Sequence, residues 1–279
     1  MTVRKFKLIN AQGAEWDLMR KDGFFYAPEG LGVAQDNEYM RIGSTYERIQ
    51  KLSAQKQVNG NMIFSSYSVY HEFTRFIVFS PLKLAYMPVD EWAYLDGDFT
   101  TLEKAEFNPQ TRRLECPAVF TATSLWYIPR AARKTADDVE SPKRYNYTYG
   151  YQYADELNGY IRVTNNASED SPAVITIMGA ISNPAWYVSV NNDVIASGSV
   201  TADIPAENKL VINSKDGQLE VAEYVAATNE FVKNHYQDTD FSRETFVLFP
   251  PGNSVLFITG TNQGSINAWV EVEEIHDTV

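Results

Sequence analysis

Apolar side chains at every second position are the feature of this 279-residue chain that most limits its fold. The pattern occurs in residues 6–9, 82–86 and 254–259, among others. Successive side chains of a β-strand point to opposite faces, so such alternation predicts strands with one buried face. The sequence therefore predicts a mainly β protein, and a hydrophobic content of 44% is sufficient to build its core.

Residues 66–79 have helical spacing instead. Their apolar side chains are Tyr67, Tyr70, Phe73, Phe76 and Ile77. Residues three and four apart lie on one face of a helix, Ser66 can cap the N-terminus, and Pro81 ends the segment. We expect one main helix here, with its aromatic stripe in the core rather than around a cofactor.

Turn signals separate the predicted strands. Gln12 and Gly13 predict a first hairpin, Asn59 and Gly60 predict a turn because Asn-Gly accepts positive φ, and residues 191–193 predict another. In the second half, short strands at this spacing indicate a β-sandwich. These strands are expected at residues 160–163, 173–178, 186–190, 209–213, 218–221, 245–249, 254–259 and 266–273.

Charge is distributed unequally along the chain. Residues 1–133 carry 16 basic and 15 acidic side chains, whereas residues 134–279 carry 8 basic and 21 acidic ones. Residues 133–144 are rich in charge, contain a proline and have almost no core residues, which indicates a linker or exposed arm. We expect an N-terminal domain over 1–133 that can pack against copies of itself, and an acidic domain over 134–279 that faces water. An acidic surface with no role in assembly explains the same charges.

Composition argues against several kinds of protein. A pI near 4.8 argues against nucleic acid as the main partner. Apolar runs such as residues 76–79 are far shorter than the about 20 residues of a membrane helix, and residues 1–10 lack the core of an export signal. Cys116 is the single cysteine and cannot form an intramolecular disulfide. We expect a soluble protein of a reducing cytoplasm that binds no membrane and is stabilised by packing.

Motifs for catalysis or for a cofactor are incomplete. Gly30 and Gly32 are followed by Gln35, where a dinucleotide-binding loop requires a third glycine. A hydrolytic triad has few possible bases, namely His71, His235 and His276. Residues 235–244 resemble the start of a calcium loop, but Arg243 replaces the glycine of its sharp turn. The sequence predicts no enzyme, no cofactor and no metal.

Five tyrosines occupy alternate positions: Tyr145, Tyr147, Tyr149, Tyr151 and Tyr153. An extended strand would present all of them on one face. Tyrosine suits a protein interface or a sugar platform, because its ring can be dry while its hydroxyl is wet. We therefore consider this ladder a candidate aromatic interface, and the inner face of a sandwich strand explains it equally well.

Five stretches resemble the distal tail (Dit) proteins of bacteriophages with long, non-contractile tails. They are residues 24–32, 67–79, 120–127, 177–186 and 248–253. They follow the order found in the family and cover nearly the whole chain. The sequence is therefore similar to the Dit family.

The resemblance implies an N-terminal, ring-forming β domain with a helix and a C-terminal galectin-like β-sandwich. Proteins of this family form a hexameric ring between the tail tube protein and the tail-tip protein with its fibre or lysin, and support receptor-binding or baseplate proteins. The implied protein is a structural part of the virion, made in the cytoplasm of the bacterial host, with no specific binding of nucleic acid. In some relatives the last stretch packs on the first domain, so residues 265–279 can be assigned to either one.

Pro28, Gly30, Leu31 and Gly32 form the candidate assembly loop, because proline and glycine permit a tight turn beside a neighbouring subunit. An ordinary turn within one subunit is the alternative. A second possible function is a carbohydrate-binding module, in which Trp186, Trp269 or the tyrosine ladder stacks on sugars of the host cell wall. A glycoside hydrolase built on a β-sandwich is a third.

Overall fold

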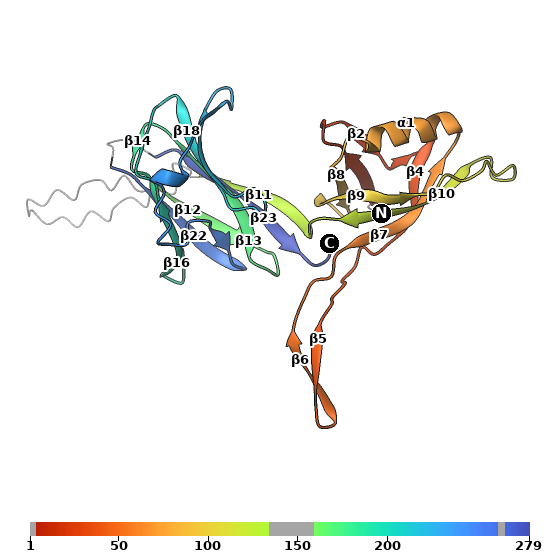
Figure 1. The fold of residues 1–279 in the computed structure, drawn as a ribbon, viewed down its shortest axis with the longest axis horizontal. Coiled ribbons are helices and arrows are strands. Elements are labelled where there is room, and N and C mark those ends of the chain that lie inside the picture. Colours follow the sequence, from red (N-terminus) through yellow and green to blue (C-terminus); the bar gives the residue numbers. More distant parts are fainter. Residues whose placement is uncertain (1–3, 134–158, 262–265) are drawn as a thin grey trace, which may run out of the picture. The chain divides into compact units, whose positions relative to one another are not determined.

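The computed structural model describes residues 4–133, 159–261 and 266–279 (Figure 1). The chain divides into two compact units. Unit 1 comprises Met1–Ile128 and Ile275–Val279, and unit 2 comprises Pro129–Glu274. The described residues contain many strands and one α-helix, which confirms the prediction of a mainly β protein. They include no helix long and apolar enough to cross a membrane.

Unit 1 is an antiparallel sheet with one helix. Its strands pair in the order β2-β1-β8-β9-β10-β7-β4-β3. Leu18 forms hydrogen bonds to strands near both ends of this order. Its N–H donates to Phe6 O of β1 (3.0 Å), and its carbonyl accepts from Phe25 N of β4 (2.9 Å). The elements are β1 (Lys5–Ile9), β2 (Glu15–Asp17), β3 (Met19–Arg20), β4 (Gly23–Glu29), β5 (Glu38–Ile42), β6 (Thr45–Gln50), β7 (Gln57–Phe64), α1 (Tyr67–Ile77), β8 (Leu82–Met87), β9 (Ala93–Leu102), β10 (Leu114–Ala122) and β11 (Trp126–Arg133), whose last residues belong to unit 2.

Helix α1 confirms the predicted helix and its aromatic core face. The side chain of Ser66 caps it by accepting from the Val69 N–H. Phe73 is fully buried, with its ring 5.2 Å from Trp16 and 5.4 Å from Phe64. Aromatic pairs at this separation stabilise beyond their buried area. The helix is therefore held by packing across the sheet.

One predicted hairpin is confirmed and one predicted turn is wrong. β1 pairs with β2 around Gly13, which has a φ of +76°. Asn59 and Gly60, in contrast, lie inside β7. A Cβ on Gly60 would lie 2.7 Å from two ring carbons of Phe25, so this glycine makes room for an aromatic ring and does not form a turn.

Unit 2 contains two sheets packed face to face. One has the order β20-β19-β18-β13-β23, with β21 paired to β13, and the other has the order β12-β22-β15-β16. The strands are β12 (Gly159–Asn165), β13 (Ser171–Met178), β14 (Ile181–Ser182), β15 (Ala185–Val190), β16 (Asp193–Ser199), β17 (Asp203–Ile204), β18 (Asn208–Asn213), β19 (Glu220–Val225), β20 (Phe231–Asn234), β21 (Leu248–Phe249), β22 (Gly252–Thr259) and β23 (Ala268–His276), with a 3₁₀ turn at Tyr236–Asp238. The last two residues of β23 belong to unit 1.

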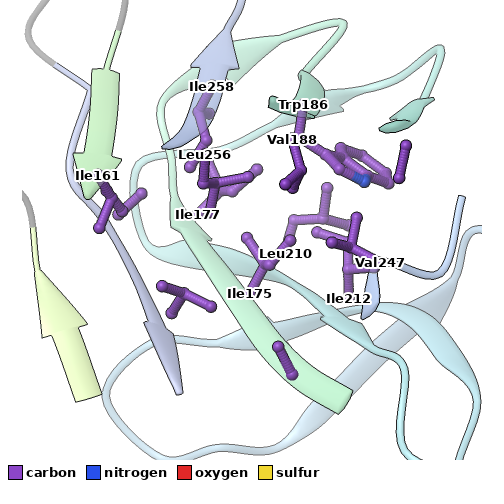
Figure 2. Packing of buried hydrophobic residues seen from close by; sticks show 14 of the residues in the cluster. Ile161, Ile175, Ile177, Trp186, Val188, Leu210, Ile212, Val247, Leu256 and Ile258 are labelled. Carbon is purple, nitrogen blue, oxygen red and sulfur yellow. The ribbon is translucent and has the colours of Figure 1, made fainter. Parts of the chain in front are cut away.

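The core of unit 2 lies between these sheets. Figure 2 shows Ile175, Ile177 and Leu210 from one sheet facing Val188 and Leu256 from the other. The predicted β-sandwich is thus present, and the predicted turn at residues 191–193 joins β15 to β16. Its Asn191 and Asn192 have φ values of +52° and +73°. Three predicted strands have the wrong limits. β21 includes only the end of residues 245–249, β19 begins after residue 218 and runs past residue 221, and β23 begins after residue 266 and runs past residue 273.

Candidate assembly arm

A long hairpin leaves unit 1 between β4 and β7 (Figure 1). We call the antiparallel pair β5–β6, residues 38–50, the arm. Towards the sheet, Gln35 and Ser53 form a further bridge, and backbone bonds join Asp36 N to Leu52 O (2.9 Å) and Ala54 N to Ala34 O (3.0 Å). The two segments at the base of the arm are therefore hydrogen-bonded to each other between the arm and strands β4 and β7.

Every residue of the arm is exposed on both faces. Cross-strand pairing places Tyr39 beside Arg48 and Tyr46 beside Arg41, so one face carries two tyrosines and two arginines. The opposite face carries Met40 and Ile42. The exposed fractions of Tyr46 and Met40 are 68% and 50%. Tyrosine and arginine are the residues that most often dominate binding at protein interfaces.

The candidate assembly loop lies at the root of the arm. Pro28 lies inside β4, where the register with β7 shifts between Tyr26 and Glu29. Gly30 has a φ of +85°, and a Cβ there would lie 2.0 Å from Gln57 O. Only glycine fits this combination of backbone angle and close approach. Pro28 thus belongs to a strand instead of a loop, whereas Gly30, Leu31 and Gly32 follow it outside regular structure.

Lys56 forms a hydrogen bond to the candidate assembly loop. Its side chain is buried, and Nζ donates to Gly32 O at 2.8 Å. Burial lowers the pKa of the Lys56 ammonium group, and the negative charge of Asp277 opposes this shift. The loop also contacts the last residues of the chain, because Thr278 Oγ1 donates to Leu31 O at 3.5 Å.

Asp277 contacts two residues at the base of the arm, Ser53 and Lys51. Its carboxylate accepts a 2.5 Å hydrogen bond from Ser53 Oγ and lies 3.6 Å from Lys51 Nζ. The hydrogen bond from Ser53 and the charge of Lys51 lower the pKa of Asp277. We call Ser53, Lys56 and Asp277 the clamp. Ser53 and Asp277 are 224 positions apart in the sequence, so no local pattern could have identified this contact.

The arm was not predicted, although its sequence contains a signal. Strand-forming residues at 39–42 and 45–49 flank Gly43, which has a φ of +63°. That pattern predicts a hairpin. Its side chains do not separate into a polar and an apolar face, so a search for strands that bury one face passes over it.

The other predicted residues lie elsewhere. The candidate aromatic interface, Tyr145, Tyr147, Tyr149, Tyr151 and Tyr153, is outside the described residues. Trp186 cannot stack on a sugar, because it is 1% exposed and its Nε1 donates to Thr245 O. Trp269 is partly buried in β23.

The segment that resembles a calcium loop forms an internal polar network. His235 is buried, with Nδ1 2.8 Å from Asp238 Oδ2 and Nε2 3.0 Å from Glu223 Oε2. Hydrogen bonds from Lys233 and His235 lower the pKa of Asp238. Within residues 4–133, 159–261 and 266–279, no group of three or more histidine, cysteine or acidic side chains is arranged to hold a metal ion. The network joins β19 to the turn after β20.

Comparisons with known proteins agree with this fold. Residues 5–123 match the family model of the distal tail protein N-terminal domain. A chain of the phage P2 baseplate in its activated conformation with calcium is similar in structure, with a TM-score of 0.68, 15% identity and full coverage of both chains. The same baseplate with strontium gives 0.67 and 15%, covering 99% of this chain and 100% of the other.

The Dit protein of phage SPP1 is also similar, with a TM-score of 0.63 and 7% identity over 96% of this chain and 98% of the other. No curated protein sequence matches the chain. At these identities the structural matches concern the fold, while the family model also matches the sequence. Residues 5–123 therefore match a distal tail protein N-terminal domain, and the chain as a whole is similar in fold to the Dit protein of phage SPP1.

Proposed function

We propose that this protein is a structural component of a phage tail baseplate, whose copies close into a hexameric ring between the tail tube and the tail-tip and receptor-binding proteins. The family model and the similar folds support the baseplate role. The ring and its partners are our proposal. In it, the N-terminal domain of residues 1–133 forms the ring and the acidic domain of residues 134–279 faces outward.

The exposed arm is the main observation that supports a ring. A two-stranded hairpin with nothing packed on either face is marginally stable in water. The arm also leaves Met40, Ile42 and Ile49 exposed, at 50%, 46% and 59%. A second copy of the chain is the simplest partner, because every subunit then supplies one arm and one surface that receives it, as in a closed head-to-tail ring.

Charge favours the same arrangement. Residues 1–133 have a net charge of +1, so these parts can approach each other with little repulsion. Residues 134–279 have a net charge of −13 and repel their counterparts in neighbouring subunits. A ring with the near-neutral parts in contact and the acidic parts apart keeps this repulsion low.

The test removes the apolar contacts of the arm. Ile42 and Ile49 are 46% and 59% exposed in the single chain, so burying the remainder stabilises by about 1 kcal/mol for each side chain. We expect Ile42→Ser with Ile49→Ser to weaken subunit association about 30-fold, since 2 kcal/mol corresponds to that factor. The control is Val194→Ser, which changes a 60% exposed side chain of unit 2.

The measurement is light scattering and sedimentation across a range of concentrations, with negative-stain imaging of the largest species. Rings that require a higher concentration in the arm variant alone support the proposal. A wild-type chain that stays monomeric at millimolar concentration and moderate salt contradicts it, as does equal association of the arm variant and the wild type.

A further inference from the structure

Unit 2 has a hollow on the outer face of its four-stranded sheet, with a volume of about 410 Å³. Its floor comes from neighbouring strands in direct register, where Arg162 of β12 pairs with Val255 of β22 and Val255 pairs with Ser189 of β15. Residues in register across a sheet point to the same face. Their neighbours Ile161, Val188 and Leu256 face the core, so this surface is the outer one.

Polar side chains surround this floor. Thr164 pairs with Asn253, and Thr164 Oγ1 donates to Asn253 Oδ1 at 2.9 Å. Asn191 and Asn192, from the turn between β15 and β16, line the same hollow. These hydroxyl and amide groups offer both donors and acceptors.

Aromatic side chains occupy the next row on the same face of the sheet. In the next row of the sheet, Tyr160 pairs with Phe257 and Phe257 pairs with Tyr187. The rings of Tyr187 and Phe257 are stacked, with centroids 4.7 Å apart and planes 12° from parallel. All three side chains are partly exposed. A polar hollow thus lies beside a row of accessible aromatic rings.

The charge of the hollow differs from that of its surroundings. Its lining contains Arg162 and no acidic residue, although residues 134–279 have a net charge of −13. Arg162 forms no ion pair with any residue that the structure describes, and its guanidinium lies 5.6 Å from the centre of the Tyr160 ring. An arginine without a carboxylate partner is suited to bind an acidic group of a ligand in two hydrogen bonds.

We infer that this hollow binds an acidic saccharide, with its acid group on Arg162, its hydroxyls on the Asn and Thr side chains and its apolar ring face against the aromatic row. A saccharide combines these three chemistries in one unit. A peptide strand would add to a sheet edge, whereas the hollow lies on a sheet face. A nucleic acid carries a phosphate at every nucleotide, so the surrounding negative charge repels it more strongly than a saccharide with an isolated acid group.

The test uses the full chain and defined probes. Four probes are each titrated by calorimetry and by NMR chemical shifts. They are a tetrasaccharide that contains glucuronate, a poly(glycerol phosphate), the neutral chitotetraose and inorganic phosphate. We expect the glucuronate tetrasaccharide to bind, whereas poly(glycerol phosphate) and inorganic phosphate have no sugar ring and chitotetraose has no acid group. Arg162→Ala should weaken that binding at least tenfold. Asn192→Gly removes an amide while keeping the positive φ of the turn, and we expect a smaller loss.

Arg243→Ala is the matched control, because Arg243 is an exposed arginine of unit 2 outside the hollow. Shifts at Tyr187 that appear with the glucuronate tetrasaccharide and vanish in Arg162→Ala support the inference. It is overturned by the absence of binding to the glucuronate tetrasaccharide, by equal binding of poly(glycerol phosphate), chitotetraose or inorganic phosphate, or by equal losses in Arg162→Ala and Arg243→Ala. None of these outcomes depends on whether the chain forms a ring.

Discussion

Gly30 and Gly32 lie two residues apart in the candidate assembly loop, yet the structure predicts opposite results for the same substitution. At Gly30 the φ is +85° and a Cβ would lie 2.0 Å from Gln57 O. At Gly32 a Cβ would meet no atom within 4 Å, and φ is outside the left-handed region. Gly30→Ala and Gly32→Ala therefore form a matched pair.

The expected cost at Gly30 has two parts. An alanine in the left-handed region costs about 1 kcal/mol. The Gln57 carbonyl cannot move freely, because Gln57 begins β7 and pairs with Thr121 of β10. Forcing atoms into such a site costs about 1 to 3 kcal/mol. We therefore expect Gly30→Ala to lower the free energy of unfolding of unit 1 by about 3 kcal/mol.

Gly32→Ala should change this free energy by less than about 1 kcal/mol, with a small gain because alanine restricts the unfolded chain. For a unit of this size, 1 kcal/mol corresponds to about 4 °C in Tm. Calorimetry of the full chain should therefore show a fall of roughly 12 °C in the unit 1 transition for Gly30→Ala and little change for Gly32→Ala. Equal shifts for the two variants, in either direction, would refute this account of the loop.

Two further predictions concern the clamp and the core of unit 1. Asp277→Asn removes the charge that faces Ser53 and Lys51, so hydrogen exchange at the base of the arm should increase; unchanged exchange would count against the clamp. The pKa of Asp277 is lowered in the fold, so the ionised carboxylate stabilises the folded state. This contribution is complete above the ordinary aspartate pKa of about 4 and is lost as the pH falls through the lowered value. Asp277→Asn should abolish this acid dependence in unfolding experiments. Phe73→Ala should lower the free energy of unfolding in a denaturant titration by about 3 to 5 kcal/mol, because it empties a fully buried site among aromatic rings. The control is Val78→Ala, at a 74% exposed position, which should have little effect.

Local patterns predicted the parts of the fold that local physics controls. The helix at residues 66–79 was found because its aromatic spacing and the Ser66 cap act within a few residues. The turn at residues 191–193 was found because asparagine accepts the positive φ that a tight hairpin needs. The same reasoning failed at Gly60, where the glycine accommodates the ring of Phe25 from another strand.

The candidate site was predicted only in part. Gly30 was singled out for its freedom at positive φ, and the structure places it at the root of the arm. Lys56 and Asp277 carried no signal, since a single lysine and a single aspartate are common surface residues. Trp186 looked available for stacking because an aromatic residue in a strand has the same sequence signature on either face of a sandwich.

The helix at residues 66–79 and the turns at Gly13 and at residues 191–193 were determined by the sequence alone, because each depends on neighbours a few residues away. The separation of charge along the chain was counted directly from the sequence. The tertiary structure decided which side chains are covered. It buried Trp186 and Lys56, left the arm bare on both faces, and brought Asp277 to Ser53. Burial depends on contacts between residues far apart in the chain, and those contacts exist only after the sheets have packed.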